Sequence, residues 1–291
     1  MKKVLITGVS GFLGHHVTNT CQQRGWYVVG VDKRPIPANH FVPNHFIQTD
    51  VFDLGYRDLV GVDFVIHLAF ATNIPNSVRH PKETTYQNID MTVHLLEMCK
   101  EAGVKRVFFP STASLYGANL TPWKEDMPPC CIEPYSWQKM SLEALCGLYT
   151  RSYGLETVVG RFFQIFGELQ REDTALAAFL RSKREGKPIT LTQTTAQSSF
   201  KSGQRDFIYA GDVAEAVCLI LEKGEKGEIY NVGSGIIHTM EEIANTIGGE
   251  VNWIEKRGYE VERHLACIDK LKDLGWTPKV SILDWLNENS K

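Results

Sequence analysis

The sequence has 291 residues, of which 43% are hydrophobic. A chain of this length and composition can bury a sizeable core, so we expect one large domain, or a large domain with a smaller companion. The 31 Lys and Arg residues are balanced by 34 Asp and Glu residues. The resulting formal net charge of -3 excludes a general electrostatic attraction to nucleic acid or to an anionic membrane.

Targeting, membrane and metal signals are also weak. The first residues hold two lysines but too short an apolar run for a signal peptide, and the apolar stretch Val62–Ala71 is interrupted by Asp63 and His67. The seven cysteines lack the paired spacings of zinc or redox sites, so we expect reduced thiols and no metal site. The sequence predicts a soluble, cytoplasmic protein without a nucleic-acid or membrane partner.

Short apolar segments rich in β-forming residues alternate with segments of helical periodicity. The expected strands are Val4–Thr7, Tyr27–Val31, His45–Thr49, Phe64–His67, Arg106–Phe109 and Thr157–Val159. The expected helices are Leu13–Arg24, Thr85–Ala102 and Ser136–Tyr153, and Gly25, Gly103 and Gly154 stand where these helices should end. This alternation predicts an α/β fold with a doubly wound parallel sheet, the Rossmann arrangement.

The pattern changes after Gly167. A basic helical stretch covers Phe179–Glu185. The Ser/Thr/Gln-rich run Thr190–Ser202 contains little that could fill a core and is expected to be a mobile segment near a ligand. Arg205–Val213 and Glu228–Val232 are predicted to return to the sheet as strands. Small helices are predicted at Thr239–Ile247, Ile268–Leu274 and Ile282–Asn287. We therefore expect a dinucleotide-binding domain of residues 1–166 and 205–232, and a smaller C-terminal substrate-binding cap of residues 167–204 and 233–291.

A glycine-rich turn follows the first strand directly. Gly8, Gly11 and Gly14 lie between this strand and the first helix, with Phe12 and Leu13 between the last two glycines. Such a turn lets the backbone approach a pyrophosphate, which is then held by the free N–H groups of the helix. The spacing differs from G-x-G-x-x-G by one residue. We interpret the turn as a dinucleotide site because of its place between strand and helix.

The second strand ends at Asp32, where a carboxylate accepts hydrogen bonds from the adenosine ribose. This acid favours NAD, because it repels the 2'-phosphate of NADP. The following Lys33 and Arg34 keep NADP open as an alternative, since cations at this turn can bind the extra phosphate. Asp50 and Val51, after the third strand, are placed to meet the adenine.

Tyr135 and Lys139 are four residues apart and therefore share one face of a helix. A neighbouring ammonium favours the phenolate, so Tyr135 can act as a base or an acid. Ser111, Thr112 and Ser114 follow the strand that ends at Phe109, at the edge of the sheet where ligands bind. Their hydroxyl groups are expected to hold a substrate oxygen against Tyr135.

Together these residues resemble the extended short-chain dehydrogenase/reductase family, in its nucleotide-sugar epimerase/dehydratase branch. The similar segments occur in the family's order over nearly the whole chain: Thr7–Gly14, His67–Ala69, Ser111–Gly117, Tyr135 with Lys139, Gly160–Gly167, Arg205–Tyr209 and Tyr230–Gly233.

The resemblance implies roles for individual residues. Thr112 takes the position of the catalytic Ser/Thr, Tyr135 that of the general base, and Lys139 that of the residue that binds the nicotinamide ribose. The expected cofactor contacts are Gly8, Gly11, Phe12, Leu13, Gly14, Asp32, Lys33, Asp50, Val51, Leu68, Ala69, Tyr135, Lys139 and Phe162. The expected substrate contacts are Thr72, Ser111, Thr112, Ser114, Gln164, Arg205 and Arg263.

For three further residues, a structural role is an alternative to contact with a ligand. Arg205 is expected either at the substrate diphosphate or in an ion pair with its neighbour Asp206. His67 and Asn88 are expected to have structural roles, His67 at the strand end that lines the cofactor and Asn88 as a buried amide within a helix.

The same residues can serve more than one reaction. The related 4,6-dehydratases carry an acidic pair after the catalytic Thr, but Ala113 and Ser114 stand here. We therefore expect an NAD-dependent nucleotide-sugar 4-epimerase, with an NAD(P)H-dependent reductase of a nucleotide-linked 4-keto-6-deoxy sugar as the alternative. A non-catalytic dinucleotide sensor is a third hypothesis. The helices Thr85–Ala102 and Ser136–Tyr153 are expected to pair across a two-fold axis in a homodimer.

Overall fold

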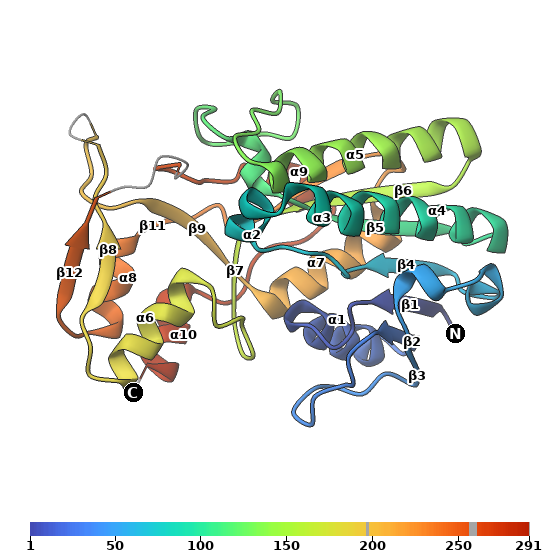
Figure 1. The fold of residues 1–291 in the computed structure, drawn as a ribbon, viewed down its shortest axis with the longest axis horizontal. Coiled ribbons are helices and arrows are strands. Elements are labelled where there is room, and N and C mark those ends of the chain that lie inside the picture. Colours follow the sequence, from blue (N-terminus) through green and yellow to red (C-terminus); the bar gives the residue numbers. More distant parts are fainter. Residues whose placement is uncertain (196–197, 256–260, 291) are drawn as a thin grey trace.

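The computed structural model describes residues 1–195, 198–255 and 261–290. Its main sheet has seven strands in the spatial order β10-β6-β5-β4-β1-β2-β3, and every neighbouring pair is parallel (Figure 1). The strands are β1 (Lys3–Thr7), β2 (Tyr27–Asp32), β3 (His45–Gln48), β4 (Phe64–His67), β5 (Arg106–Thr112), β6 (Glu156–Phe162) and β10 (Ile229–Val232). This order confirms the predicted doubly wound sheet. Its switch point lies between β1 and β4, where such sheets bind ligands.

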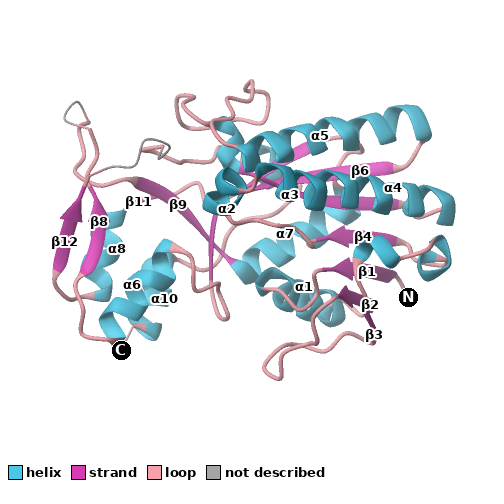
Figure 2. Ribbon diagram, in the orientation of Figure 1, coloured by secondary structure: helices cyan, strands magenta, loops and turns pink. Residues whose placement is uncertain are grey.

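Helices cover both faces of the sheet (Figure 2). Helices α1 (Phe12–Gln23) and α7 (Ala210–Lys223) pack on one face, where Val4, Ile6 and Phe108 are fully buried. Helices α4 (Met91–Ala102) and α5 (Pro134–Tyr153) pack on the other face, against the alternate strand residues. Because both faces are covered, the strands are continuous apolar runs rather than alternating ones.

The predicted helix Thr85–Ala102 is helical throughout but not uniform. Helices α2 (Ile74–Arg79) and α3 (Pro81–Thr85) precede a π-helical turn at Tyr86–Asp90, and α4 follows. Gly103 and Gly154 adopt the left-handed conformation at the ends of α4 and α5, as predicted.

The remaining elements lie outside the main sheet. A three-stranded sheet contains β7 (Gln164–Phe166), β9 (Gln204–Tyr209) and β11 (Ile237–Thr239), and a two-stranded parallel sheet contains β8 (Ile189–Thr192) and β12 (Val251–Ile254). The helices are α6 (Ala175–Arg184), α8 (Met240–Ile247), α9 (Asp269–Lys272) and α10 (Ile282–Asn289). Helices α6, α8 and α10 share a third apolar core that includes Phe166, Phe207 and Trp285, whereas Leu271 of α9 belongs to the core on the α1 and α7 side of the main sheet. The domain boundaries stay a prediction.

Two predictions for this region need correction. Arg205–Val213 is not a strand of the main sheet, because β9 pairs with β7 and β11 and the chain turns into α7 at Ala210. The Ser/Thr/Gln-rich run does contribute to a core, since its Leu191 is buried in β8. Its residues 196 and 197 lie outside the described residues. No helix in the described part of the chain is both long and apolar enough to span a bilayer.

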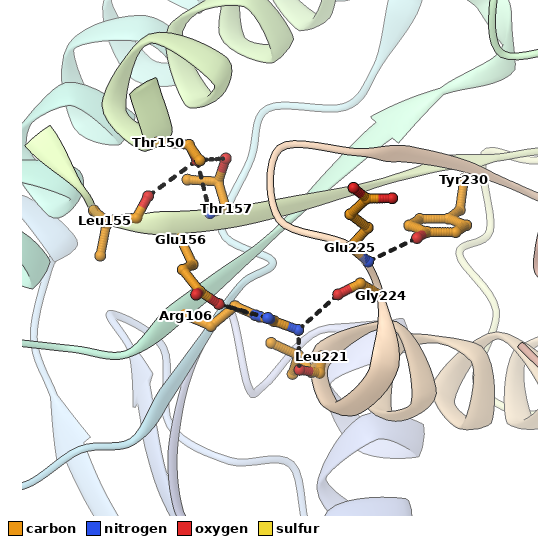
Figure 3. Close-up of polar contacts among 9 residues, drawn as sticks. All are labelled: Arg106, Thr150, Leu155, Glu156, Thr157, Leu221, Gly224, Glu225 and Tyr230. Carbon is orange, nitrogen blue, oxygen red and sulfur yellow. Dashed lines mark hydrogen bonds and ion pairs between the residues drawn. The ribbon is translucent and has the colours of Figure 1, made fainter. Parts of the chain in front are cut away.

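Arg106 is the first residue of β5, at the amino ends of the parallel strands, and its side chain joins β5 to β6 and α7. Figure 3 shows its side chain between Glu156 of β6 and the end of α7. Nε donates to the Glu156 carboxylate over 2.9 Å, and Nη1 donates to the carbonyl oxygens of Leu221 and Gly224, both over 2.9 Å. These carbonyls belong to the last turn of α7 and its C-cap, where cations are favourable.

Replacing Arg106 by Leu should therefore lower the free energy of unfolding by about 1 to 3 kcal/mol, because carbonyls and a carboxylate lose their donors. Lys105→Leu is the control, since the Lys105 side chain is 72% exposed in its ion pair with Asp63 and such pairs contribute about 1 kcal/mol or less. Urea denaturation measures both. Equal effects of the two substitutions would contradict this interpretation.

Candidate active site

The glycine turn after β1 has no room for side chains. Gly8 has a φ of +73°, and a Cβ there would lie 2.8 Å from the backbone nitrogen of Ala69. A Cβ on Gly14 would lie 2.4 Å from the carbonyl oxygen of Gly8. Leu68 and Ala69, both expected at the cofactor, thus lie directly against the turn. The glycines bring the start of α1 close to the ends of β1 and β4, which fits the binding of a dinucleotide pyrophosphate.

Gly14→Ala should therefore lower the affinity for NAD about tenfold or more, because α1 must shift and charge-assisted hydrogen bonds to the phosphates weaken. Gly147→Ala is a matched control, since its Cβ would be close only to the flexible side chain of Arg151. Isothermal titration with NAD measures both variants. Unchanged affinity in Gly14→Ala would show that the turn does not bind the cofactor.

The carboxylate of Asp32 is held at the same corner. Its Oδ2 accepts from the backbone N–H of Ser10 over 3.1 Å, and its Oδ1 accepts from the backbone N–H and Nε of Arg34 over 3.0 and 3.3 Å. Lys33 lies 3.8 Å from Asp50. Arg34 and Lys33, the two cations that could bind the 2'-phosphate of NADP, therefore lie beside the carboxylates of Asp32 and Asp50. Val51, the proposed adenine contact, is buried beside Asp50.

His67 and Asn88 organise the loop after β4. The ring of His67 is 1% exposed and lies between the hydroxyls of Thr7, at 2.7 Å, and Thr92, at 3.2 Å. Burial lowers its pKa well below the usual value, so the ring is neutral. The amide of Asn88 bonds both the N–H and the C=O of Ala71, which fixes the loop. Both side chains have structural partners, in line with their expected roles.

Thr112, Tyr135 and Lys139 come together at the carboxyl end of β5. Thr112 ends this strand and Tyr135 lies in the first turn of α5, which brings the Tyr135 phenol close enough to the Thr112 side chain for Thr112 to affect its pKa. Lys139, one turn further along α5, donates from Nζ to the carbonyl oxygen of Pro110 over 2.8 Å. All three side chains are more than nine-tenths buried. The geometry allows a proton of a bound hydroxyl to be taken up by Tyr135.

The charges around Tyr135 oppose one another. Burial raises the pKa of its phenol, and the Glu133 carboxylate raises it further, whereas Arg171 and the Thr112 side chain lower it. Burial also lowers the pKa of Lys139 well below its usual value. The Lys139 ammonium lies 5.9 Å from the centre of the Tyr135 ring. A cationic nicotinamide ring near the phenol would favour the phenolate in the same direction as Arg171.

Glu133 and Arg171 were not identified from the sequence. Glu133 caps α5 by accepting from the N–H of Ser136 over 3.0 Å. Arg171 donates to the hydroxyl of Thr72, and Asn73 donates to Asp173 over 2.7 Å. The loop after β4 is thereby joined to the loop before α6 beside Tyr135. The acidic and basic residues of 171–173 follow no periodic pattern, so no sequence signal marked them.

The other proposed substrate residues divide into two groups. Ser111 and Ser114 lie beside Thr112, and the Ser111 hydroxyl is buried without a hydrogen-bond partner among the described residues. Arg205 on β9 lies near Arg263, because Gln204 and Arg263 form a β-bridge. The Arg205 guanidinium donates to the carbonyl oxygens of Gln204 and Glu262. Gln164 opens β7, on the strand next to β9.

Asp206, the alternative partner expected for Arg205, has hydrogen bonds of its own. The carboxylate of Asp206 accepts hydrogen bonds from the N–H and hydroxyl of Ser234 and from the N–H groups of Gly235 and Ala266. Asp206 therefore ties β9 to the segments after β10 and before α9. Phe162, a proposed cofactor contact, ends β6 beside Thr112 and stacks on Phe108.

Comparison with known proteins gives the family. The profile of the NAD dependent epimerase/dehydratase family matches residues 4–233. The chain belongs to this family. Membership confirms the resemblance seen in the sequence, the assignment as an enzyme and NAD as the cofactor. The glycine turn and Asp32 fit that cofactor.

Individual relatives are moderately similar. The chain is 28% identical over 322 residues to the trifunctional UDP-glucose 4,6-dehydratase/UDP-4-keto-6-deoxy-D-glucose 3,5-epimerase/UDP-4-keto-L-rhamnose-reductase of Arabidopsis thaliana, covering 99% of this chain and 47% of that protein. It thus spans about half the length of this and two similar Arabidopsis relatives.

Solved structures of similar proteins match over nearly their whole length. UDP-glucose 4-epimerase of Thermotoga maritima with UDP-glucose gives a TM-score of 0.89 at 28% identity, covering 99% of this chain and 97% of that one. UDP-glucose 4-epimerase of Thermus thermophilus with NAD gives 0.87 at 29% identity, with the same coverages.

Proposed function

We propose that the protein is an NAD-dependent 4-epimerase of a nucleotide-linked sugar and that it acts through a 4-keto intermediate. The observation that carries this proposal is that Thr112 at the end of β5 and Tyr135 in the first turn of α5 meet at one place, while Ala113 and Ser114, not acidic residues, follow Thr112. Ala113 is buried, and Ser114 donates its N–H to Thr112. Epimerisation needs a base and a hydride acceptor, whereas elimination of water also needs a group that protonates the leaving hydroxyl.

The residues of the chain have separate tasks in this reaction. Tyr135 takes the proton of the sugar 4-hydroxyl, and Thr112 orients that hydroxyl by hydrogen bonding. The Lys139 charge favours the phenolate of Tyr135. NAD supplies a reversible hydride acceptor. Tyr135 then returns the proton after the ketone has turned its other face, so the base is regenerated.

Other residues would hold the two ligands. Gly8, Gly11 and Gly14 would cradle the pyrophosphate and Asp32 would bind the adenosine ribose. Arg205 and Arg263 would meet the substrate diphosphate. The bound UDP-glucose of the Thermotoga relative supports a uridine diphosphate sugar as the substrate. We also propose a homodimer, supported by Trp137 and Leu148, which are exposed on one face of α5; light scattering of the purified protein tests it.

The test is to incubate the purified protein with a panel of UDP- and dTDP-sugars and to identify the products by NMR. The proposal predicts that one sugar equilibrates with its C4 epimer without NADPH. Formation of a 4-keto-6-deoxy sugar would contradict it in favour of dehydration. Conversion of an added 4-keto sugar only while NADPH is consumed would contradict it in favour of reduction.

A further inference from the structure

Aromatic rings surround the buried ammonium of Lys139. Its Nζ lies 3.1 Å from the centre of the Phe70 ring, 4.8 Å from that of Phe109 and 5.9 Å from that of Tyr135. The side chain is 1% exposed, and its hydrogen bond goes to the carbonyl oxygen of Pro110. We call Phe70, Phe109 and Tyr135 the aromatic cage.

The charged and titratable groups near Lys139 do not neutralise it. On its own helix these are Tyr135, Glu143 and Cys146, and from the end of β4 it faces the neutral ring of His67. The Glu143 carboxylate is bound by Arg161, over 2.8 and 3.0 Å. A buried cation without a bonded carboxylate is costly. A cation over an aromatic face, within about 6 Å of the centre, is attracted by the ring quadrupole, and more strongly when water is excluded.

Phe70 is the cage residue held most directly against the ammonium. Its ring meets that of Phe109 edge to face, with centres 5.4 Å apart, and that of His67 at 4.4 Å. Asn88 fixes the backbone of the next residue, Ala71, through two hydrogen bonds. The position of the Phe70 ring is therefore set by the fold of the loop after β4.

We propose that Phe70, with Phe109 and Tyr135, keeps the Lys139 ammonium charged and in place within the active site, and that Phe70 is a positioning residue. The functional consequence rests on the proposed function, because it is through Tyr135 that the Lys139 charge would act. Phe70→Leu removes the ring face but keeps an apolar side chain. Phe70→Tyr keeps the face.

The experiment follows the titration of Lys139 in the full chain saturated with NAD. Lysine labelled with carbon-13 at Cε reports the charge of each ammonium by NMR, and the Lys139 signal is the one lost in Lys139→Met. Phe70→Leu should lower the titration midpoint of Lys139 by about one pH unit or more, as expected for loss of a desolvated cation–π contact. Phe70→Tyr should restore the wild-type midpoint.

Phe64→Leu is the matched control. Phe64 begins β4 and its ring lies 5.6 Å from the ammonium of Lys2, so the control removes an aromatic ring near a different cation. It should leave the midpoint of Lys139 unchanged. Phe70→Met provides a second variant without the ring if Phe70→Leu does not fold, as judged by thermal unfolding. A wild-type midpoint in the folded leucine or methionine variant would overturn the proposal.

The titration needs no turnover, so it separates this inference from the proposed function. A shifted midpoint in a protein that epimerises no sugar would support the cage and contradict the proposed activity. If the wild-type enzyme is active and Phe70→Leu leaves the titration midpoint of Lys139 unchanged, the proposed activity is supported and the cage is contradicted. In an active enzyme, the pH profile of kcat should also shift in Phe70→Leu and return in Phe70→Tyr.

Discussion

Tyr135→Phe is expected to lower kcat for the sugar interconversion about a thousandfold, because the substrate hydroxyl loses its proton acceptor. The ring of Phe fits the same site, where the tyrosine is 8% exposed. NAD binding should therefore change little. The measurement is a coupled assay of epimer formation together with titration of the cofactor.

The same helix provides a control for this substitution. Tyr149 lies on α5, and its hydroxyl donates to Glu97 rather than to a residue of the candidate site. Tyr149→Phe should keep the wild-type kcat to within about a factor of two, as for substitutions outside the reacting groups. A Tyr135→Phe protein as active as Tyr149→Phe would rule out Tyr135 as the base.

Arg161→Leu is expected to lower the free energy of unfolding by about 3 to 5 kcal/mol, because it leaves the buried carboxylate of Glu143 without its cation. The two side chains are 3% and 6% exposed and form two hydrogen bonds. Nη1 of Arg161 also donates to the hydroxyl of Tyr116 and to the carbonyl oxygen of Glu125. The arginine thus joins β6, α5 and the segment between β5 and α5.

Arg181→Leu gives the contrast for this second prediction. Its ion pair with Glu172 is exposed, with 45% and 72% of the side chains accessible, so its loss should cost about 1 kcal/mol or less. Urea denaturation compares the two variants. A cost for Arg161→Leu no larger than that for Arg181→Leu would mean that the buried pair contributes little to stability.

The main sheet could be predicted from the sequence because several local signals agree. Strands that are buried on both faces are continuous apolar runs. Gly103 and Gly154 mark helix ends, because the residue after the helix adopts the left-handed conformation that glycine favours. The prediction of one strand over Arg205–Val213 was wrong because the β-rich start of this segment continues into the apolar first turn of α7. Only the pairing of β9 with β7 and β11 separates the two parts.

The candidate site was predictable where neighbours in sequence carry the chemistry. Tyr135 and Lys139 share a helix face, and Thr112 follows a strand that ends at the ligand-binding edge. Arg171 and Phe70 were not predictable in this way. Arg171 reaches Thr72 across 99 positions, and Phe70 meets Lys139 only through the packing of the loop after β4 on α5. Such contacts depend on tertiary structure and leave no periodic trace.

The most direct test of the central claim follows the hydrogen at C4 of the sugar. A UDP-sugar substrate carrying deuterium at C4 is converted in ordinary water, and the deuterium content at C4 of the epimer is measured by NMR and mass spectrometry. Removal and return of one hydride within the site predicts full retention of deuterium at C4. Epimer in which solvent hydrogen has replaced the deuterium would contradict the account.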